Sequence, residues 1–381
     1  MKVLILGFDR FDSLEWNLCD TFNRMGIECR IIDPYKNFPF NFRFKLQAIL
    51  RFSKKMEDLF WNRFINNLRV LKADLIISTL QNLPPEFSEN IRDFENSPVI
   101  MWNPDPVYAL FASREYSLYG NYDLYIVEVP FMENYFKNIL HKPVICVPEG
   151  FNPFIHSPPS IPKAEAEKNG PDIVIAGTLY YERALILEHL TDYNLEIYGI
   201  YPGWLRSPVI KYHKRKYLTG LEKAKKFFSS KICLNTIHYA NIDGTNCRLF
   251  EIAGAGGFQI AEFRESIPEY FTPDKEIILY KSIDDLKEKV DFYIRHPALR
   301  WKIAEAGRKR ALKERKIAEK QLKSDLQKER IKLEESLKVP ILGVIPFHQE
   351  VLASMSGEVF VATRREHPFS KLMVEIAQRL L

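Results

Sequence analysis

Short apolar runs alternate with helix-length segments along most of this chain of 381 residues. The first half contains KVLILG, ECRIID, ADLIIST, PVIMWN, DLYIVEV and PVICVPEG, and the second half contains DIVIAG, LEIYGI, KICLNTI, FQIAEF and EIILY. Such an alternation is typical of a parallel sheet that is covered by helices. The sequence therefore predicts an α/β fold made of two Rossmann-like halves.

The alternation is interrupted at residues 157–171, where SPPSIPKAEAEKNGP loses apolar residues and gathers proline and charge. This composition predicts an interdomain linker between a domain at 1–156 and a second domain at 172–312. A cleft between two such halves is the default place for a ligand. The remaining segment, 313–381, is predicted to continue a long, charged, exposed helix from Ala298 and to end in a strand and an amphipathic helix.

The overall composition excludes several classes of protein. The 54 basic and 49 acidic residues give a net charge of +5. They form no basic block of the kind that nucleic-acid-binding proteins carry. Five widely spaced cysteines without a CxxC pair indicate neither a disulfide framework nor a zinc site. The N-terminal apolar run is too short for a signal peptide. We therefore expect a soluble, cytoplasmic protein.

Membrane contact, if there is any, is expected to be peripheral, because no stretch approaches the roughly 20 apolar residues of a membrane span. The basic run KYHKRKY, at Lys211–Tyr217, has two interpretations. It either forms a solvated loop or attracts an anionic acceptor or a lipid surface.

The most informative segment is KICLNTIHYANIDGTNCRLFEIAGAGGFQIAEF, at residues 231–263. A strand is followed by a polar loop and by a helix that begins near Cys247, and the N-terminus of such a helix suits a diphosphate. Asp243 and Glu251 are eight residues apart, and both carboxylates could accept hydrogen bonds from the hydroxyls of a sugar. The alternative is a capping Asp and a solvent-facing helical Glu.

The stretch DGTNCRLFEIAGAGGFQIAEF resembles the donor-binding segment of group 1 glycosyltransferases, especially their CgeB-like spore-maturation branch. The segments PEGFNPFIHSP, GTLYYERALILEHL, LEIYGI and DFYIRHPALRWKIAEAGRKRAL match the family in order, so the resemblance runs from about Pro143 to Leu312. It is looser in the N-terminal half, where WNPDP is similar to the family's aromatic-acid-Pro stretch. The resemblance implies the GT-B fold, in which two Rossmann-like domains face each other across a cleft. The N-terminal domain would bind the acceptor, and the C-terminal domain the nucleotide-sugar donor.

The resemblance also implies roles for individual residues. Glu251 matches the glutamate that holds the nucleotide ribose, and Asp243 matches the acid that contacts the donor sugar. Arg248 and Arg183 are candidates for neutralising the diphosphate, since the arginine side chain presents a fixed fork of donors. Alternatively, Arg183 is an exposed helical residue, and Arg248 pairs locally with Glu251 or Asp243. The donor site would be completed by Gly177, Gly244, Thr245 and Asn246.

The implied chemistry is metal-independent transfer with retention at the anomeric carbon, with no cofactor beyond the donor substrate. A helix N-terminus and arginines can stabilise the leaving diphosphate without a metal ion. Asp105, which follows the strand PVIMW, and His238, which ends a strand before the donor loop, are the other catalytic candidates. Each also has a structural interpretation, as a turn-forming Asp and as a packed His. The acceptor, whether a saccharide, a lipid or a small molecule, is left open.

Three further interpretations were compared with this one. A nucleotide-sugar epimerase would need acid and base groups around the sugar ring. A non-catalytic sugar-nucleotide-binding protein would need only the donor loop. The first turn, GFDRFDS, lacks the GxGxxG spacing of dinucleotide-binding enzymes. The C-terminal tail from VPILGVIPF onward is similar to the closing segment of MinD-like ATPases, but the chain has no GK[ST] sequence to form a P-loop.

Overall fold

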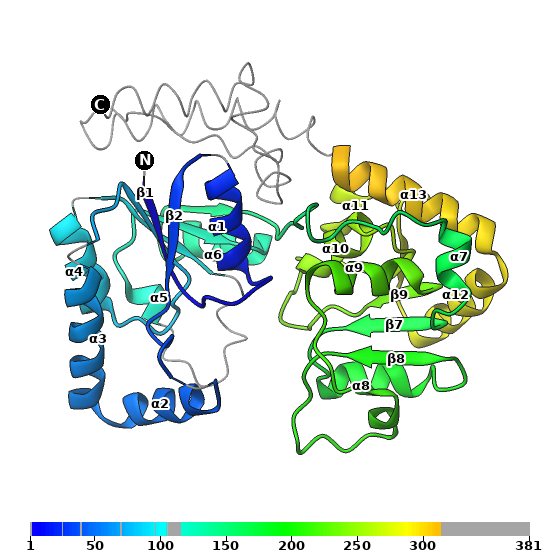
Figure 1. Ribbon diagram of the computed structural model, residues 1–381, viewed down its shortest axis with the longest axis horizontal. Helices are drawn as coiled ribbons and strands as arrows, with labels where there is room; N and C mark the ends of the chain where they lie inside the picture. The colour runs from blue at the N-terminus through cyan, green and yellow to red at the C-terminus, as the bar shows by residue number, and fades with distance from the viewer. Residues whose placement is uncertain are drawn as a thin grey trace. The chain divides into compact units, whose positions relative to one another are not determined.

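The computed structural model describes residues 2–24, 26–38, 40–68, 71–95, 97–103, 105 and 116–313. These residues form two compact units, of which unit 1 ends at Pro148 and unit 2 begins at Glu149 (Figure 1). Each unit contains one parallel sheet with flanking helices, which confirms the predicted α/β class. The predicted C-terminal extension lies, apart from residue 313, outside the described residues. No helix in the described part of the chain is long and apolar enough to span a membrane.

Unit 1 has a six-stranded sheet in the order β2-β1-β3-β4-β5-β6. The inner strands β1, β3, β4 and β5 are largely buried, which explains their continuous apolar runs, whereas Glu28 and Arg30 of the edge strand β2 are exposed. The strands are β1 (Lys2–Leu6), β2 (Glu28–Ile32), β3 (Leu75–Ser78), β4 (Val99–Trp102), β5 (Leu124–Val127) and β6 (Val144–Cys146). The helices are α1 (Leu14–Arg24), α2 (Phe40–Phe52), α3 (Lys54–Leu68), α4 (Pro85–Glu95), α5 (Tyr116–Tyr119) and α6 (Pro130–Asn138).

Unit 2 has a five-stranded sheet in the order β11-β10-β9-β7-β8. The strands are β7 (Ile173–Ala176), β8 (Leu195–Tyr198), β9 (Ile232–Asn235), β10 (Gln259–Glu262) and β11 (Ile278–Tyr280). The helices are α7 (Lys163–Glu167), α8 (Tyr181–Glu188), the 3-10 helix η2 (Pro208–Tyr212), α9 (Gly220–Ser229), α10 (Cys247–Gly254), α11 (Ile267–Tyr270), α12 (Ile283–Arg295) and α13 (Pro297–Lys313).

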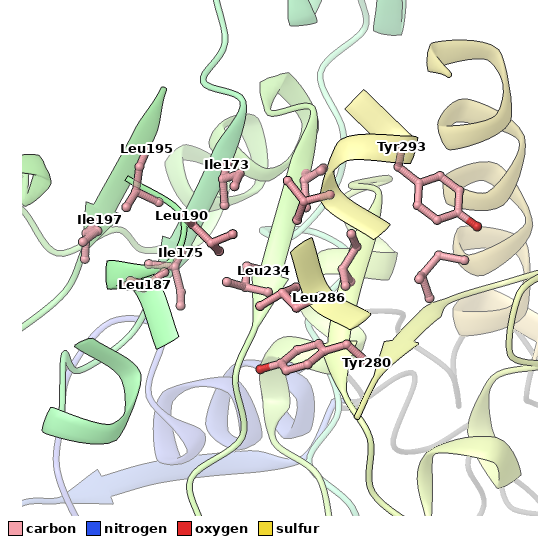
Figure 2. Close-up of a cluster of buried hydrophobic side chains, with 14 of the residues drawn as sticks. Ile173, Ile175, Leu187, Leu190, Leu195, Ile197, Leu234, Tyr280, Leu286 and Tyr293 are labelled. Carbon is pink, nitrogen blue, oxygen red and sulfur yellow. The ribbon is translucent and has the colours of Figure 1, made fainter. Parts of the chain in front are cut away.

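The core of unit 2 lies between this sheet and the helices α8 and α12. Ile173, Ile175 and Leu234 project from β7 and β9, and they pack with Leu187 of α8 and Leu286 of α12 (Figure 2). All five side chains are buried. At about 25 cal/mol per Å² of apolar surface, such burial is the dominant favourable term for folding the unit.

The strand order of unit 2 reverses between β7 and β9. The chain runs from β7 to β8 on one side and then crosses to β9 on the other side of β7, so that Ile173 pairs with Ile232. In open parallel sheets, ligands bind outside the carboxyl ends of the strands at such a switch point. The topology therefore directs attention to the residues that follow β7 and β9.

Residues 157–171, predicted as a linker, include helix α7 and are fastened to unit 2. Arg300 of α13 donates to Glu167 at 2.6 Å, and both side chains are buried. Lys163 Nζ lies 3.6 Å from the other carboxylate oxygen of Glu167. Helix α13 was predicted to be exposed along its length. That prediction is wrong for this part, because Arg300 and Ile303 are buried in unit 2.

Candidate functional site

Two glycines bring the backbone close together at the carboxyl edge of the unit 2 sheet. Gly177 follows β7 with φ 141°, and Gly199 follows β8 with φ 132°, values that L-residues rarely adopt. A Cβ on Gly199 would overlap the carbonyl group of Gly177. Both positions therefore require glycine. Because Gly177 has no side chain, neighbouring side chains can approach the end of β7.

Arg183, in the first turn of α8, joins the carboxyl ends of β7 and β9. Its Nε donates to Thr236 Oγ1 at 2.6 Å, its Nη2 to the Thr236 carbonyl at 3.3 Å, and its Nη1 to the Thr178 carbonyl. Burial, followed by the nearby charge of Arg248, lowers the pKa of Arg183 to about 9. The alternative that Arg183 is an exposed helical residue is thus wrong, since the side chain is 3% exposed and all its hydrogen-bond acceptors are neutral.

Arg248 meets Arg183 beside Gly177. An ideal Cβ on Gly177 would lie 2.9 Å from Nη1 of Arg248 and 3.1 Å from Nη1 of Arg183. The two like-charged nitrogens are therefore at most about 6 Å apart. Within the described part of the chain Arg248 makes no hydrogen bond or ion pair, so the predicted local pairing with Glu251 or Asp243 does not form. Two guanidinium groups this close repel each other, and an anion between them would remove that cost.

Arg248 of the arginine pair belongs to the first turn of α10. Asn246 caps the helix by accepting from Leu249 N at 3.3 Å, and its amide pairs with that of Asn235 at 3.1 and 3.2 Å. The helix terminus is not entirely free, because Glu149 accepts from Cys247 N at 2.9 Å. Among the described residues, no acceptor contacts the backbone N–H groups of Gly244, Thr245 and Arg248.

One buried hydroxyl in the loop also lacks a partner. Thr245 Oγ1 is buried and makes no hydrogen bond within the described residues, although the Thr245 carbonyl accepts from Asn241 Nδ2 at 2.6 Å. A buried, unsatisfied hydroxyl costs free energy. Together with the free N–H groups of Gly244 and Arg248, it provides several donors for one ligand.

Arg264, at the end of β10, holds the loop in place. It donates to the carbonyls of Asn241 at 3.0 Å and Ile237 at 3.3 Å, and to Glu262 Oε1 at 2.8 Å. The other oxygen of Glu262 accepts from Ile237 N at 3.1 Å. Asp243 is half-buried in this loop, and its carbonyl accepts from Ser266 N at 3.3 Å. The loop that carries Asp243 is therefore fixed at several points along its backbone.

Glu251 is buried rather than solvent-facing, so the alternative of an exposed helical Glu is wrong. Its Oε1 lies 2.7 Å from Lys223 Nζ and 3.7 Å from His156 Nε2. His156 Nδ1 accepts from Asn152 N at 3.0 Å, which places the imidazole proton on Nε2, toward Glu251. No donor of the described residues contacts Oε2. The carboxylate thus has one oxygen held by the Lys223 ammonium and one available to accept hydrogen bonds.

The sequence reasoning did not identify Lys223, His156, Glu149 or Arg264. Lys223 could have been found from the sequence, because it lies on the same face of α9 as the buried residues Ala224 and Phe227. A lysine on a buried helix face implies a nearby partner. His156 and Glu149 gave no such signal, since they reach α10 only through the folded path of the segment that precedes α7.

The two remaining catalytic candidates are His238 of unit 2 and Asp105 of unit 1. His238 follows β9, and its ring packs against Tyr180 at 5.0 Å and Tyr239 at 4.2 Å between ring centroids. Its Nε2 lies 3.7 Å from Glu182 Oε1. Asp105 is exposed and belongs to unit 1, after β4. The catalytic roles of His238 and Asp105 stay predictions.

Comparison with known proteins places this arrangement in a known fold. Residues 183–320 match the family described as Glycosyl transferase-like. Sucrose-phosphate synthase from Thermosynechococcus elongatus superposes with a TM-score of 0.54 at 13% identity, covering 82% of this chain and 94% of that one. HepE from Anabaena, solved in complex with UDP-glucose, superposes with a TM-score of 0.55 at 11% identity and the same coverage, 82% and 94%. No curated protein sequence matches the chain.

The chain has the GT-B fold, and residues 183–320 are glycosyltransferase-like. The family match begins at Arg183 in α8 and covers all of β9, α10 and β10, so it includes Arg183, Arg248 and Glu251. The structural similarities, at such low identity, concern the GT-B fold alone. The CgeB-like branch and the resemblance of the tail to MinD-like ATPases stay predictions.

Proposed function

We propose that this GT-B protein transfers a sugar from a nucleoside diphosphate sugar, bound by unit 2, to an acceptor bound by unit 1. The observation that carries the proposal is the pair Arg183 and Arg248, which meet beside Gly177 with no acidic partner among the described residues. They lie at the switch point of the sheet, where a ligand is expected. A diphosphate supplies the anionic charge that this pair lacks.

The surrounding groups suit the other parts of such a donor. Oε2 of Glu251 can accept from ribose hydroxyls, while Lys223 holds Oε1 at 2.7 Å. Asp243 is proposed to contact the donor sugar. The N–H groups of Gly244 and Thr245 are proposed to bind the phosphates. Because the arginines and these donors can stabilise the leaving diphosphate, we propose transfer that needs no metal ion and retains the anomeric configuration.

Binding of nucleoside diphosphates tests the donor site directly. We expect at least one of UDP, GDP and ADP to raise the melting temperature, since a ligand at 100 times its Kd stabilises the native state by about 2.7 kcal/mol. UDP is the first choice because the Anabaena HepE structure contains UDP-glucose. Binding should persist in excess EDTA. A protein that responds to none of the three contradicts the proposal.

Arg248→Ala should weaken this binding roughly ten- to hundredfold, the range for losing a charge-assisted hydrogen bond. The matched control is Arg295→Ala, an exposed arginine in the last turn of α12 that donates only to a backbone carbonyl. Isothermal titration of both variants gives the comparison. Equal losses of affinity in the two variants would show that Arg248 does not contribute to nucleotide binding.

Gly177→Ala is a second probe of the same position. The new Cβ would require a φ that alanine avoids and would approach Nη1 of Arg248 to 2.9 Å. We expect weaker nucleotide binding together with a loss of about 1–3 kcal/mol in stability. Gly203→Ala, where nothing lies within 4 Å of the added Cβ, should change neither quantity.

The reaction itself distinguishes transfer from the alternatives. With a radiolabelled nucleotide sugar and a panel of saccharide, lipid and small-molecule acceptors, a transferase releases the nucleoside diphosphate and labels an acceptor. An epimerase returns a labelled nucleotide sugar and releases no diphosphate. A non-catalytic binding protein leaves the donor unchanged.

A further inference from the structure

Helix α2 of unit 1 is apolar on two faces. Leu46 and Leu50 are buried against Tyr35, as expected for a helix that covers a core. Phe42, Ile49 and Phe52 follow a second stripe with spacings of seven and three residues, and all three are exposed. Exposed phenylalanine and isoleucine at helical spacing are not explained by packing within unit 1.

The stripe continues into α3 after a single connecting residue. Met56 and Leu59 are exposed one helical turn apart, while Trp61 and Phe64 of the same helix are buried in the core. Phe52 is 87% exposed and Leu59 is 63% exposed. We call the five exposed residues the apolar corner: Phe42, Ile49, Phe52, Met56 and Leu59. Large exposed apolar side chains that recur along two adjoining helices are typical of an interaction surface.

The charges around the apolar corner are mostly positive. Residues 40–63 contain six Lys or Arg and two acidic residues. Lys45, Lys54 and Lys55 are exposed on the same two helices, whereas Asp58 is half-buried and Glu57 is buried. Large apolar side chains flanked by lysines are the composition of helices that lie at the surface of an anionic membrane. A second copy of the chain is a poorer occupant, because the two positive surfaces would repel each other.

We propose that the apolar corner binds the surface of an anionic lipid bilayer, with Phe52 and Leu59 inserted at the level of the lipid headgroups. A different basic segment, Lys211–Tyr217, has two interpretations from the sequence, a solvated loop or a contact with an anionic surface. There Lys214 and Lys216 form ion pairs with Glu196 and Glu222. The corner contains none of the residues assigned to the donor site, so this inference is independent of the proposed transfer reaction.

Vesicle sedimentation with the full chain tests the proposal. We expect binding to vesicles of phosphatidylcholine mixed with phosphatidylglycerol, little binding to phosphatidylcholine alone, and weaker binding as salt is raised. Phe52→Ser combined with Leu59→Ser should lower the partition coefficient at least about tenfold. Lys54→Ala combined with Lys55→Ala should lower it about thirtyfold at low salt, since each lysine near an anionic surface contributes about fivefold.

Ile139→Ser is the matched control, because Ile139 is also 63% exposed and lies in the same unit. It adjoins α6, which contains one Glu and one Lys rather than a basic excess. This variant should sediment like the wild type, and circular dichroism should show that all the variants are folded. The proposal is overturned if the wild type does not bind anionic vesicles. It is also overturned if the Phe52→Ser and Leu59→Ser double variant binds them as tightly as the wild type does. It is equally overturned if ultracentrifugation shows a dimer that this variant dissociates.

Discussion

Glu251 has a buried carboxylate whose two oxygens have different surroundings. Lys223 and His156 both approach Oε1, at 2.7 and 3.7 Å, and no donor of the described residues contacts Oε2. Lys223 therefore holds one oxygen of Glu251 and leaves the other without a donor among the described residues.

Lys223→Met should be the most damaging single change in this pair. It leaves a buried carboxylate without its cation, which costs about 3–5 kcal/mol of stability. Adding Glu251→Gln should recover much of that loss, since the uncompensated charge is gone, but should not restore nucleotide binding. Urea unfolding and isothermal titration of the two single variants and the double variant measure both effects. If the losses of stability simply add, the two residues do not interact as described.

At the scale of the elements, helix α10 depends on a close contact with the segment that precedes α7. Phe151 packs in a cluster with Leu249, Phe250 and Ala253 of the helix. Its ring lies so close to Gly254 that a Cβ there would overlap it. The small residue at the end of α10 is therefore a packing requirement, and the contact holds the residues around Glu149 near the helix N-terminus.

Gly254→Ala should destabilise the protein by about 1–3 kcal/mol through overpacking, even though alanine is the better helix former. In a Phe151→Leu background the same change should cost little or be stabilising, because the overlapping ring atoms are absent. Chemical denaturation of the four proteins in this cycle gives the coupling energy. A coupling near zero would show that the helix and the ring move apart freely.

The sequence predicted the elements that have strong periodicity and missed those defined only by tertiary contacts. Every strand in the described part of the chain was expected, because most of these strands are buried and give continuous apolar runs. The short elements α7, η2 and α11 were not, since a single turn carries little periodic signal. Within the site, Arg183, Arg248 and Glu251 were identified through the family resemblance. Lys223 and His156 could not be paired with Glu251, because they lie 28 and 95 residues from it in the chain.

At the scale of the whole molecule, the buried pair of Glu167 and Arg300 joins two segments that are 133 residues apart. Arg300 also donates to the carbonyls of Tyr293 at 2.6 Å and Ile294 at 3.0 Å. The guanidinium group thus depends on α7 for its charge partner and on the end of α12 for its remaining hydrogen bonds. A fixed α7 holds the beginning of unit 2 against its last described helix.

Glu167→Gln should cost about 3–5 kcal/mol, because the Arg300 charge stays buried without its partner. Replacing both residues, with Glu167→Gln and Arg300→Met, should cost less than Glu167→Gln alone. Thermal and urea unfolding measure this, with Glu165→Gln on the exposed face of α7 as the control. If Glu167→Gln lowers the free energy of unfolding no more than the control does, the ion pair does not stabilise the fold.

The same pair determines where unit 2 can be cut for separate production. A recombinant fragment that starts at residue 172, where the apolar pattern restarts, would lack Glu167, and Arg300 would then face an empty position. It would also lack Glu149, Phe151 and His156, which contact α10. A fragment that starts at Glu149 keeps all four residues. Ligand screening on isolated unit 2 should therefore use the longer fragment.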